Sequence, residues 1–218
     1  ETEVILKSDE SLQEVVVSGT LRNVSKLNSI VPIELYKAGF FKANPTANIF
    51  EAIENINGIR GQLNCNVCNT GDIRINGQEG ANTMVLIDGL PIVSGLSTVY
   101  GLSGIPQSLI QQIEIIKGPS STLYGSEAIG GIINLITKVP EQVSPLSIES
   151  FSSSWGEINT DLGIKFLIGQ KTNLLGINHF LYQNPIDKNN DGFTDLTLQN
   201  RISIFNKLSG KKNTIAFR

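Results

Sequence analysis

Two neighbouring stretches decide the fold: M-V-L-I-D-G-L-P-I-V at residues 84–93, and I-P-Q-S-L-I-Q-Q-I-E-I-I-K-G-P-S-S-T-L-Y-G-S-E-A-I-G-G-I-I-N-L-I-T-K at residues 105–138. The first is a continuous apolar strand that a D-G turn closes. The second predicts a short helix over 105–112, a strand over 113–118, a glycine-punctuated helix and loop, and a last strand over 132–138. Short helices between apolar strands predict a small α+β domain built on a mixed sheet.

Towards the N-terminus, the same domain gains further elements. Residues 31–36 alternate in polarity and predict a strand. Thr46 or Asn48 is the expected N-cap of a helix. The apolar residues of that helix recur at helical spacing: Ile49, Phe50, Ile53 and Ile56. Ile73 and Ile75 alternate with polar neighbours, which is typical of a half-buried strand.

Beyond residue 140 the pattern changes to a period of two, as in T-D-L-G-I-K-F at 160–166. Further strands are expected over 147–155, 173–183, 197–207 and 213–218. Their connections are short turns, except for a long one over 184–195. Alternating short and long connections are typical of outer-membrane barrels. A soluble β-sandwich alternates in polarity equally well, so periodicity alone leaves both alternatives open.

Composition excludes several classes of function. The net charge is −3 and no Lys/Arg-rich run is present, so the sequence lacks the basic patch that is typical of nucleic-acid binding. Charged residues make up 17% of the chain, below the ordinary share of about 25%. No apolar run is long enough for a transmembrane helix, which takes about 20 residues. The sequence offers no nucleophile–base pair, no paired carboxylates in a cleft pattern and no phosphate loop, so we do not expect an enzyme.

The stretch 84–138 resembles the plug domain of TonB-dependent receptors, in which V-L-I-D-G-x-P and I-E-x-I-x-G-P-x-S-x-L-Y-G-x-x-A-x-G-G-x-I-N-I-I-T-K recur in this order. One departure is minor: Asn76 precedes Gly77 where the family usually has Arg. The resemblance implies three parts: an N-terminal segment over 1–29, an α+β plug domain over 30–140, and antiparallel strands of an incomplete transmembrane β-barrel over 141–218. That barrel part would supply about five strands, whereas even the smallest barrels have about eight.

The resemblance also implies a function. The chain would be the plug, or gate, of a receptor for active uptake of a scarce nutrient (a siderophore, haem, cobalamin, a metal or a glycan) into the periplasm. The plug would sit inside a barrel in the bacterial outer membrane, with the N-terminus periplasmic. TonB, outer-membrane lipid and a small nutrient would be the partners, and nucleic acid would not. The alternative is a plug-like binding module, stand-alone or truncated, that does not transport. The opening E-T-E-V-I-L-K resembles the last strand of an N-terminal domain found in receptors of Bacteroidetes type.

An L-x-E-V-V-V segment ahead of the plug resembles the TonB box. Its residues are Leu12, Glu14, Val15, Val16 and Val17. Such an extended, β-branched segment binds by adding a strand to the edge of a partner's sheet. The other interpretation is an ordinary N-terminal strand of the plug.

Cys65 and Cys68 form a lone C-x-x-C. A zinc site needs about four ligands, and the chain has one His and no second Cys pair. A thioredoxin-type site needs a βαβ setting, which is missing here. An oxidising periplasm favours a disulfide over free thiols or a metal site.

The order of strands in the plug places the loops 63–71 and 92–100 at its outward apex. There the disulfide would hold a ligand-facing loop in shape. The side chains of these loops that could contact a ligand are neutral hydrogen-bonding groups, which disfavours a strongly anionic ligand. They are Asn64, Asn66, Asn69, Thr70, Ser94, Ser97, Thr98 and Tyr100.

The long connection spells D-x-N-x-D-G-x-x-D. Its oxygen-bearing residues are Asp187, Asn189, Asp191 and Asp195. Oxygen ligands at alternate positions resemble the start of a calcium loop, although the twelfth position is Leu198 and not Glu. The loop 187–195 is therefore either a calcium site or a hairpin loop rich in Asp and Asn, and it would face outside the cell. No other cofactor is expected, and His179 is read as structural rather than as a haem ligand.

Overall fold

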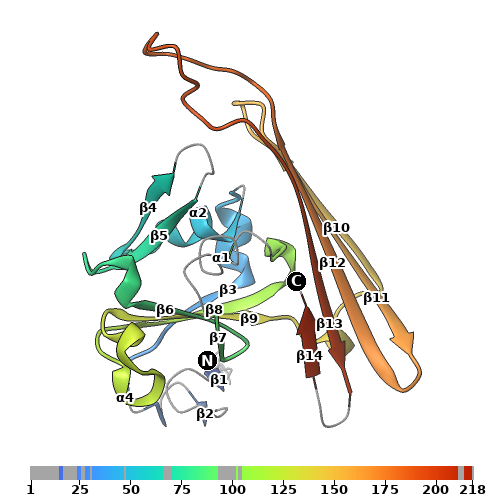
Figure 1. Cartoon of the computed structure of the whole chain (residues 1–218). Helices are drawn as coiled ribbons and strands as arrows, with labels where there is room; N and C mark the ends of the chain where they lie inside the picture. The colour runs from blue at the N-terminus through green and yellow to red at the C-terminus, as the bar shows by residue number, and fades with distance from the viewer. Residues whose placement is uncertain are drawn as a thin grey trace, which may run out of the picture.

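The computed structural model describes residues 15–16, 24–25, 28–29, 31–46, 48–65, 70–92, 102, 105–210 and 214–217. Figure 1 shows an N-terminal unit of short strands and helices, with a tall, curved wall of strands at its side. The wall consists of β10 to β14, and the unit comprises the elements before them. Within the described residues, no helix is both long and apolar enough to cross a membrane.

The strands are, in chain order, β1 (Val15–Val16), β2 (Val24–Ser25), β3 (Glu34–Lys37), β4 (Ile59–Cys65), β5 (Thr70–Ile75), β6 (Thr83–Ile87), β7 (Leu90–Pro91), β8 (Ile110–Lys117), β9 (Gly131–Thr137), β10 (Leu146–Ser152), β11 (Ile158–Ile168), β12 (Lys171–Tyr182), β13 (Gln199–Ser209) and β14 (Thr214–Phe217). The helices are α1 (Ala38–Ala43), α2 (Ile49–Glu54), α4 (Ser121–Tyr124) and the 3₁₀ turns η2 (Gly80–Asn82), η3 (Gln107–Leu109), η4 (Ser126–Ala128) and η5 (Pro140–Gln142).

The main sheet of the N-terminal unit has the strand order β3-β8-β9-β6-β7. The β6–β9 pair is parallel and the other neighbours are antiparallel. A separate hairpin, β4–β5, stands above this sheet (Figure 1). The predicted α+β class with a small mixed sheet and short helices is confirmed.

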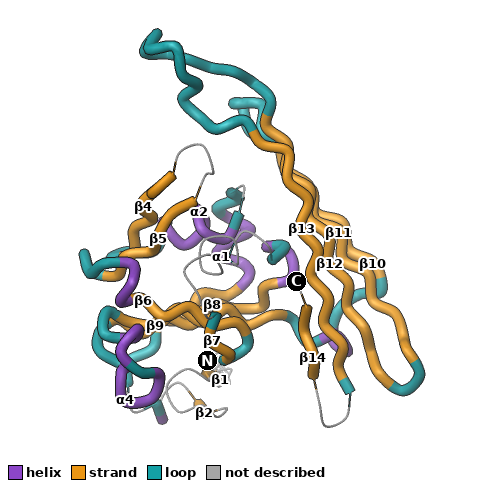
Figure 2. The backbone as a smooth tube through the Cα atoms, in the orientation of Figure 1, coloured by secondary structure: helices purple, strands orange, loops and turns teal. Residues whose placement is uncertain are grey.

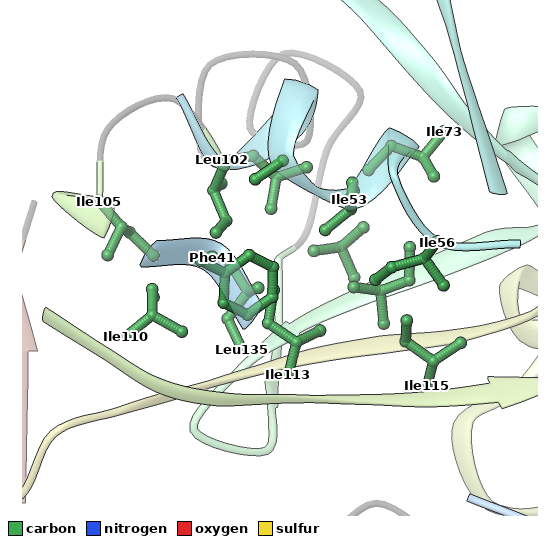
Figure 3. Packing of buried hydrophobic residues seen from close by; sticks show 14 of the residues in the cluster. Phe41, Ile53, Ile56, Ile73, Leu102, Ile105, Ile110, Ile113, Ile115 and Leu135 are labelled. Carbon is green, nitrogen blue, oxygen red and sulfur yellow. The ribbon is translucent and has the colours of Figure 1, made fainter. Parts of the chain in front are cut away.

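Apolar residues cover both faces of the main sheet. Ile113 and Ile115 of β8 point towards the helices, where they join the larger core cluster (Figure 3). Ile116 lies on the opposite face, in a smaller cluster with Met84 and Leu86. Since successive strand residues alternate between faces, the continuous apolar runs seen in the sequence are what a sheet covered on both sides requires.

The helix over the core begins where the sequence predicts. The side-chain oxygen of Asn48 accepts a hydrogen bond from the Glu51 amide at 3.0 Å, so Asn48 is the N-cap of α2 and Thr46 is not. Ile49 and Ile53 of this helix are fully buried. The helix expected over 105–112 is wrong in extent: only η3 is helical, and from Ile110 onwards the chain pairs with β9 as a strand.

The wall is a five-stranded antiparallel meander, in which each strand pairs with the next along the chain. The two-residue turn between β11 and β12 lies at one end of the wall, and the connections 153–157 and 183–198 lie together at the other end (Figure 2). The strand register sorts the side chains into two faces. The row Ile148, Leu162, Ile177 and Ile204 points outwards, and the adjacent row Glu149, Asp161, Asn178 and Ser203 points towards the N-terminal unit.

Candidate functional site: the interface between the N-terminal unit and the wall

Most of the predicted apical ligand residues lie outside the described part of the chain. Asn66, Asn69, Ser94, Ser97, Thr98 and Tyr100 belong to this group, and so does Cys68. Asn64, Cys65 and Thr70 lie at the ends of β4 and β5, where the backbone of Cys65 pairs with that of Thr70. The strands therefore extend into the predicted loop 63–71. The disulfide and the ligand role of both loops stay predictions.

The segment that resembles a TonB box is described only at Val15 and Val16. These two residues form β1, which pairs with β2 through Val15–Ser25 and Val16–Val24. The side chain of Val16 is fully buried in the smaller apolar cluster beneath the main sheet. Leu12, Glu14 and Val17 lie outside the described residues, so the assignment stays a prediction.

In the long connection, carboxylate oxygens accept hydrogen bonds from nearby backbone amides. Asp187 accepts from the amides of Asp191 and Gly192, at 3.3 and 3.0 Å, and Asp195 accepts from the amide of Lys188 at 3.1 Å. The side-chain amide of Asn189 donates to Asp191 at 2.9 Å. Across the described residues, no group of three His, Cys, Asp or Glu side chains is arranged to hold a metal ion. The calcium hypothesis stays a prediction.

His179 lies on the outward face of β12. The register pairs it with Thr160 on β11 and Ile202 on β13. Its Nε2 lies 3.0 Å from the Oδ1 of Asn200. The ring thus has a hydrogen-bond partner on the neighbouring strand.

The interface contains a charged anchor that the sequence did not reveal, formed by Asp88, Thr137 and Lys207. Lys207 projects inwards from β13, and its Nζ donates to Asp88 Oδ2 at 2.9 Å and to Thr137 Oγ1 at 2.7 Å. The amide and hydroxyl of Thr137 donate to the same carboxylate at 2.8 and 2.7 Å. Only 9% of the Lys207 side chain and 27% of the Asp88 side chain are exposed. This anchor therefore fixes the β6–β7 turn and the end of β9 to the wall.

A second contact is steric. Gly163 of β11 and Gly176 of β12 face each other in the register and form a notch in the inner face of the wall. Leu109 of η3 lies in this glycine notch and is 1% exposed. A Cβ at Gly176 would overlap Leu109 Cδ1 and would lie 3.1 Å from Pro106 Cγ. The notch thus admits the leucine because Gly176 lacks a side chain, whereas a Cβ at Gly163 would lie at an ordinary contact distance of 3.4 Å from Leu109 Cδ2.

Polar groups continue the contact next to the notch. Asp161 of β11 is 3% exposed, and its Oδ2 accepts a hydrogen bond from the Ser108 amide at 2.9 Å. The side-chain amide of Asn178 donates to Asp161 Oδ1 and to Asn159 Oδ1, at 2.7 Å each. A buried carboxylate is tolerated when hydrogen-bond donors satisfy it. These groups bind η3 to the middle of the wall.

Two cavities lie between the N-terminal unit and β10. A cavity of about 280 Å³ lies between α1, η3 and the inner faces of β10 and β11. A second cavity, of about 430 Å³, continues towards η5. Both are lined by Lys42, Lys138 and Glu149, so they form one groove of mixed polar and apolar lining between the N-terminal unit and β10. Lys42 Nζ and Glu149 Oε1 form an ion pair across it at 2.9 Å.

A half-buried tyrosine, Tyr36, lies on the edge strand β3 of the main sheet. The Tyr36 hydroxyl donates to Glu34 Oε2 at 2.9 Å. Desolvation by burial, together with the hydrogen bond and negative charge of Glu34, raises the pKa of Tyr36 to about 12. This side chain therefore stays neutral over the physiological range.

Comparison with known proteins gives one family and a set of structures. The family model described as TonB-dependent Receptor Plug Domain matches residues 25–132. A mutant of the ferric enterobactin receptor from Pseudomonas aeruginosa is 23% identical with a TM-score of 0.61, and the match covers 84% of this chain and 32% of that one. The siderophore receptor PirA from Acinetobacter baumannii is 21% identical with a TM-score of 0.60, and the match covers 88% of this chain and 31% of that one. The ferric yersiniabactin uptake receptor from Yersinia pestis is 18% identical with a TM-score of 0.66, and the match covers 85% of this chain and 30% of that one.

At these identities the solved structures share the fold, and the match extends over both the N-terminal unit and much of the wall. This chain spans about a third of the length of those receptors.

Proposed function

We propose that the chain, whose residues 25–132 match the plug domain family of TonB-dependent receptors, is the gate and first barrel strands of an outer-membrane receptor that takes up a scarce nutrient. The observation that carries this proposal is the difference in polarity between the two faces of the wall. Its outward row is apolar, with Ile148 64% exposed and Ile204 56% exposed. Its inward row is polar and contacts the plug. An apolar face towards lipid and a polar face towards a lumen are what a barrel strand needs.

The contact between plug and wall supports the same reading. In a soluble sandwich, the polar face of the wall would look into solvent and the apolar face would be covered by a second sheet. Here the polar face is the covered one: Asp161 and Asn178 are buried against the plug, while the isoleucines of the other face are exposed. This arrangement disfavours the sandwich.

Energy coupling would act through the segment that contains β1. TonB would pair with Val15 and its neighbours by strand addition, which replaces the two-residue pairing with β2. Since Val16 is buried beneath the main sheet, a pull on this segment would act directly on the apolar cluster at Met84 and Leu86.

The test is nutrient uptake by cells that carry the complete receptor. Deletion of residues 14–17 should abolish uptake and leave ligand binding at the cell surface intact. Val15→Pro should have the same effect, because proline cannot supply the amide for strand pairing, whereas Val15→Ile is the matched control and should keep uptake. Unchanged uptake by the deletion variant would reject the coupling role.

The nutrient is identified by growth on defined sources of iron, haem, cobalamin and glycan. The three solved relatives are described as siderophore receptors or as receptors for ferric enterobactin and ferric yersiniabactin. A ferric siderophore is therefore the first ligand to test here, even though the predicted apical side chains are neutral. A plug-like module that only binds predicts ligand binding and no accumulation in the periplasm, so the two measurements together separate the two functions.

A further inference from the structure

The turn that carries Asp88 is held by β9 through its backbone and through one side chain. Asp88 and Gly89 are the two residues between β6 and β7, and both have positive φ, 50° and 80°. The Asp88 amide donates to the Leu135 carbonyl at 2.9 Å. The Gly89 amide donates to the side-chain Oδ1 of Asn134 at 3.0 Å. The second bond therefore depends on which side chain occupies position 134.

Asn134 faces a carboxylate inside the main sheet. It lies directly opposite Glu114 in the register of β8 and β9, and both residues are 0% exposed. The Nδ2 of Asn134 lies 3.4 Å from Glu114 Oε2, a long hydrogen bond, and the Nε2 of Gln112 donates to Glu114 Oε1 at 3.0 Å. The same face of the sheet carries Ile116 and the smaller apolar cluster. Because polar groups in such surroundings cost free energy unless hydrogen bonds satisfy them, this pair suggests a role beyond filling space.

Glu114 determines which way the Asn134 amide points. A carboxylate only accepts hydrogen bonds, and here the side-chain amides of Gln112 and Asn134 donate to its two oxygens. Its charge also acts on α4, where burial first and then the charge of Glu114 raise the pKa of the Tyr124 hydroxyl. The Nδ2 of Asn134 is thereby held on the side of Glu114, which leaves Oδ1 on the side of Gly89. With the amide reversed, Nδ2 would face the Gly89 amide, donor against donor.

The bond to Gly89 affects the anchor because Asp88 is its neighbour in the turn. An aspartate at a φ of 50° is in the left-handed region, which residues other than glycine adopt sparingly, so contacts must hold this backbone. The Asp88 carboxylate then reaches the Nζ of Lys207 at 2.9 Å. A continuous path thus runs from Glu114 on β8, through β9 and the turn, to Lys207 on β13.

We propose that Glu114 and Asn134 are positioning residues for the anchor. Glu114 orients the Asn134 amide, and Asn134 fixes the Gly89 amide. The turn then directs the Asp88 carboxylate to Lys207. This deepens the proposed function and rests on it, because it names buried side chains of the gate that maintain its contact with the barrel wall.

The test compares two lysines in the complete receptor by reductive methylation, with each rate read by mass spectrometry. Lys207 is 9% exposed and reports the anchor. Lys117 of β8 is 20% exposed and forms an ion pair with Glu34 at 2.7 Å, so it reports the main sheet itself. General loosening of the sheet would accelerate both lysines, whereas a misplaced Asp88 accelerates Lys207 and not Lys117.

The main variants keep the size of the buried pair and change its hydrogen bonding. Asn134→Asp sets two carboxylates against each other, so the new side chain turns away and the Gly89 amide loses its acceptor. An unsatisfied buried amide is costly, so Lys207 should react about tenfold faster or more, with Lys117 unchanged. Glu114→Gln with Asn134→Asp exchanges the carboxylate and the amide. The new amide then donates to the new carboxylate, whose other oxygen accepts from Gly89, and the parental rate should return.

Two further variants address a failure to fold and a general effect of removing a buried polar group. Asn134→Leu has nearly the same size, introduces no charge and should also accelerate Lys207. Thr83→Val removes a buried hydroxyl from the neighbouring strand β6, and that hydroxyl has no hydrogen-bond partner among the described residues. Both lysines should keep their parental rates in this control.

A parental rate for Lys207 in both Asn134 variants overturns the proposal. It is also overturned if Lys117 accelerates as much as Lys207, or if the exchange variant reacts as fast as Asn134→Asp. Should Asn134→Asp give no folded receptor, Asn134→Leu decides between these outcomes. Failure of the proposed function looks different: the parent would protect Lys207 and would show no TonB-dependent uptake.

Discussion

The anchor between plug and wall allows a quantitative prediction, for which the perturbation is Asp88→Asn. Asparagine matches aspartate in size and tolerates the positive φ of 50° at this position. The change leaves the Lys207 ammonium, 9% exposed, without its counter-charge. Removing one partner of a fully buried pair costs about 3–5 kcal/mol, and exposed pairs contribute about 0–1 kcal/mol. Because Asp88 is 27% exposed, we expect a cost of about 3 kcal/mol, at the low end of the buried range.

The assay is amide hydrogen exchange in the complete receptor, read on peptides that cover β6–β7 and β9. Local opening of these strands sets their exchange rate. A loss of about 3 kcal/mol corresponds to exchange about 100- to 200-fold faster, since each 1.4 kcal/mol is a factor of ten. Peptides from α2, which the anchor does not contact, serve as the internal reference.

A second variant separates the lost charge pair from general damage. Asp88→Asn with Lys207→Met removes both charges and keeps the length of the lysine side chain. Replacing a buried ion pair by neutral groups is often neutral or stabilising, so exchange should return to within about tenfold of the parent. The reasoning is refuted if Asp88→Asn exchanges at the parental rate, or if the double variant exchanges as fast as the single one.

Three further predictions concern the notch, the last plug strand and the ionisation of a tyrosine. Gly176→Ala should destabilise the interface by about 1–3 kcal/mol, because its Cβ overlaps Leu109; adding Leu109→Ala should recover part of the protection of η3 from hydrogen exchange. Gly131→Ala should lower the yield of folded receptor, since φ at this residue is +144° and a Cβ would overlap the Ile116 carbonyl. The control is Gly39→Ala in α1, where a Cβ would meet open space; this variant should be neutral or stabilise the protein by about 0.5–1 kcal/mol. Tyr36 should ionise at about pH 12 because burial raises its pKa. Its stabilising contribution is therefore complete below its unfolded pKa of about 10 and is lost as the pH rises through 12. The difference in ultraviolet titration between the parent and Tyr36→Phe measures this ionisation, and a difference that titrates at about pH 10 would contradict the prediction.

The local elements of the plug could be predicted because their signals are local. Asn48 caps α2 through its own side chain, and the D-G turn after β6 has positive φ at both central residues, 50° at Asp88 and 80° at Gly89. The strands of the wall follow from period-2 alternation in the same way. Each of these features depends on residues within one turn or one strand of each other.

The misread helix shows where local signals fail. Ile105, Leu109 and Ile110 recur at helical spacing, which favoured a helix over 105–112. In the structure, Ile110 pairs with Thr137 and Gln112 with Ile136. These tertiary hydrogen bonds override the local preference, and the helical part shrinks to η3. Helix α1 was not predicted, since Lys37 at its N-cap makes no side-chain capping bond.

The interface could not be read from the sequence. Asp88 looked like a turn residue, and Lys207 like an ordinary member of an alternating strand. The two are 119 residues apart in the chain and meet only when the wall packs on the plug. One signal was available: Lys207 occupies the lumen-facing parity of its strand, where a charged residue at a barrel wall needs a partner inside.

The facing glycines of the wall affect which register neighbouring strands can adopt when the sheet assembles. A slip of one residue between neighbouring strands would turn the apolar row inwards, so alternation alone forbids it. A slip of two residues keeps every side chain on its proper face, and alternation cannot detect it. Such a slip would move Gly163 about 7 Å away from Gly176 and place Asp161 or Lys165 beside the recess that receives Leu109. Packing of Leu109 against the wall therefore disfavours slips by two residues, which the alternation of apolar and polar side chains does not prevent.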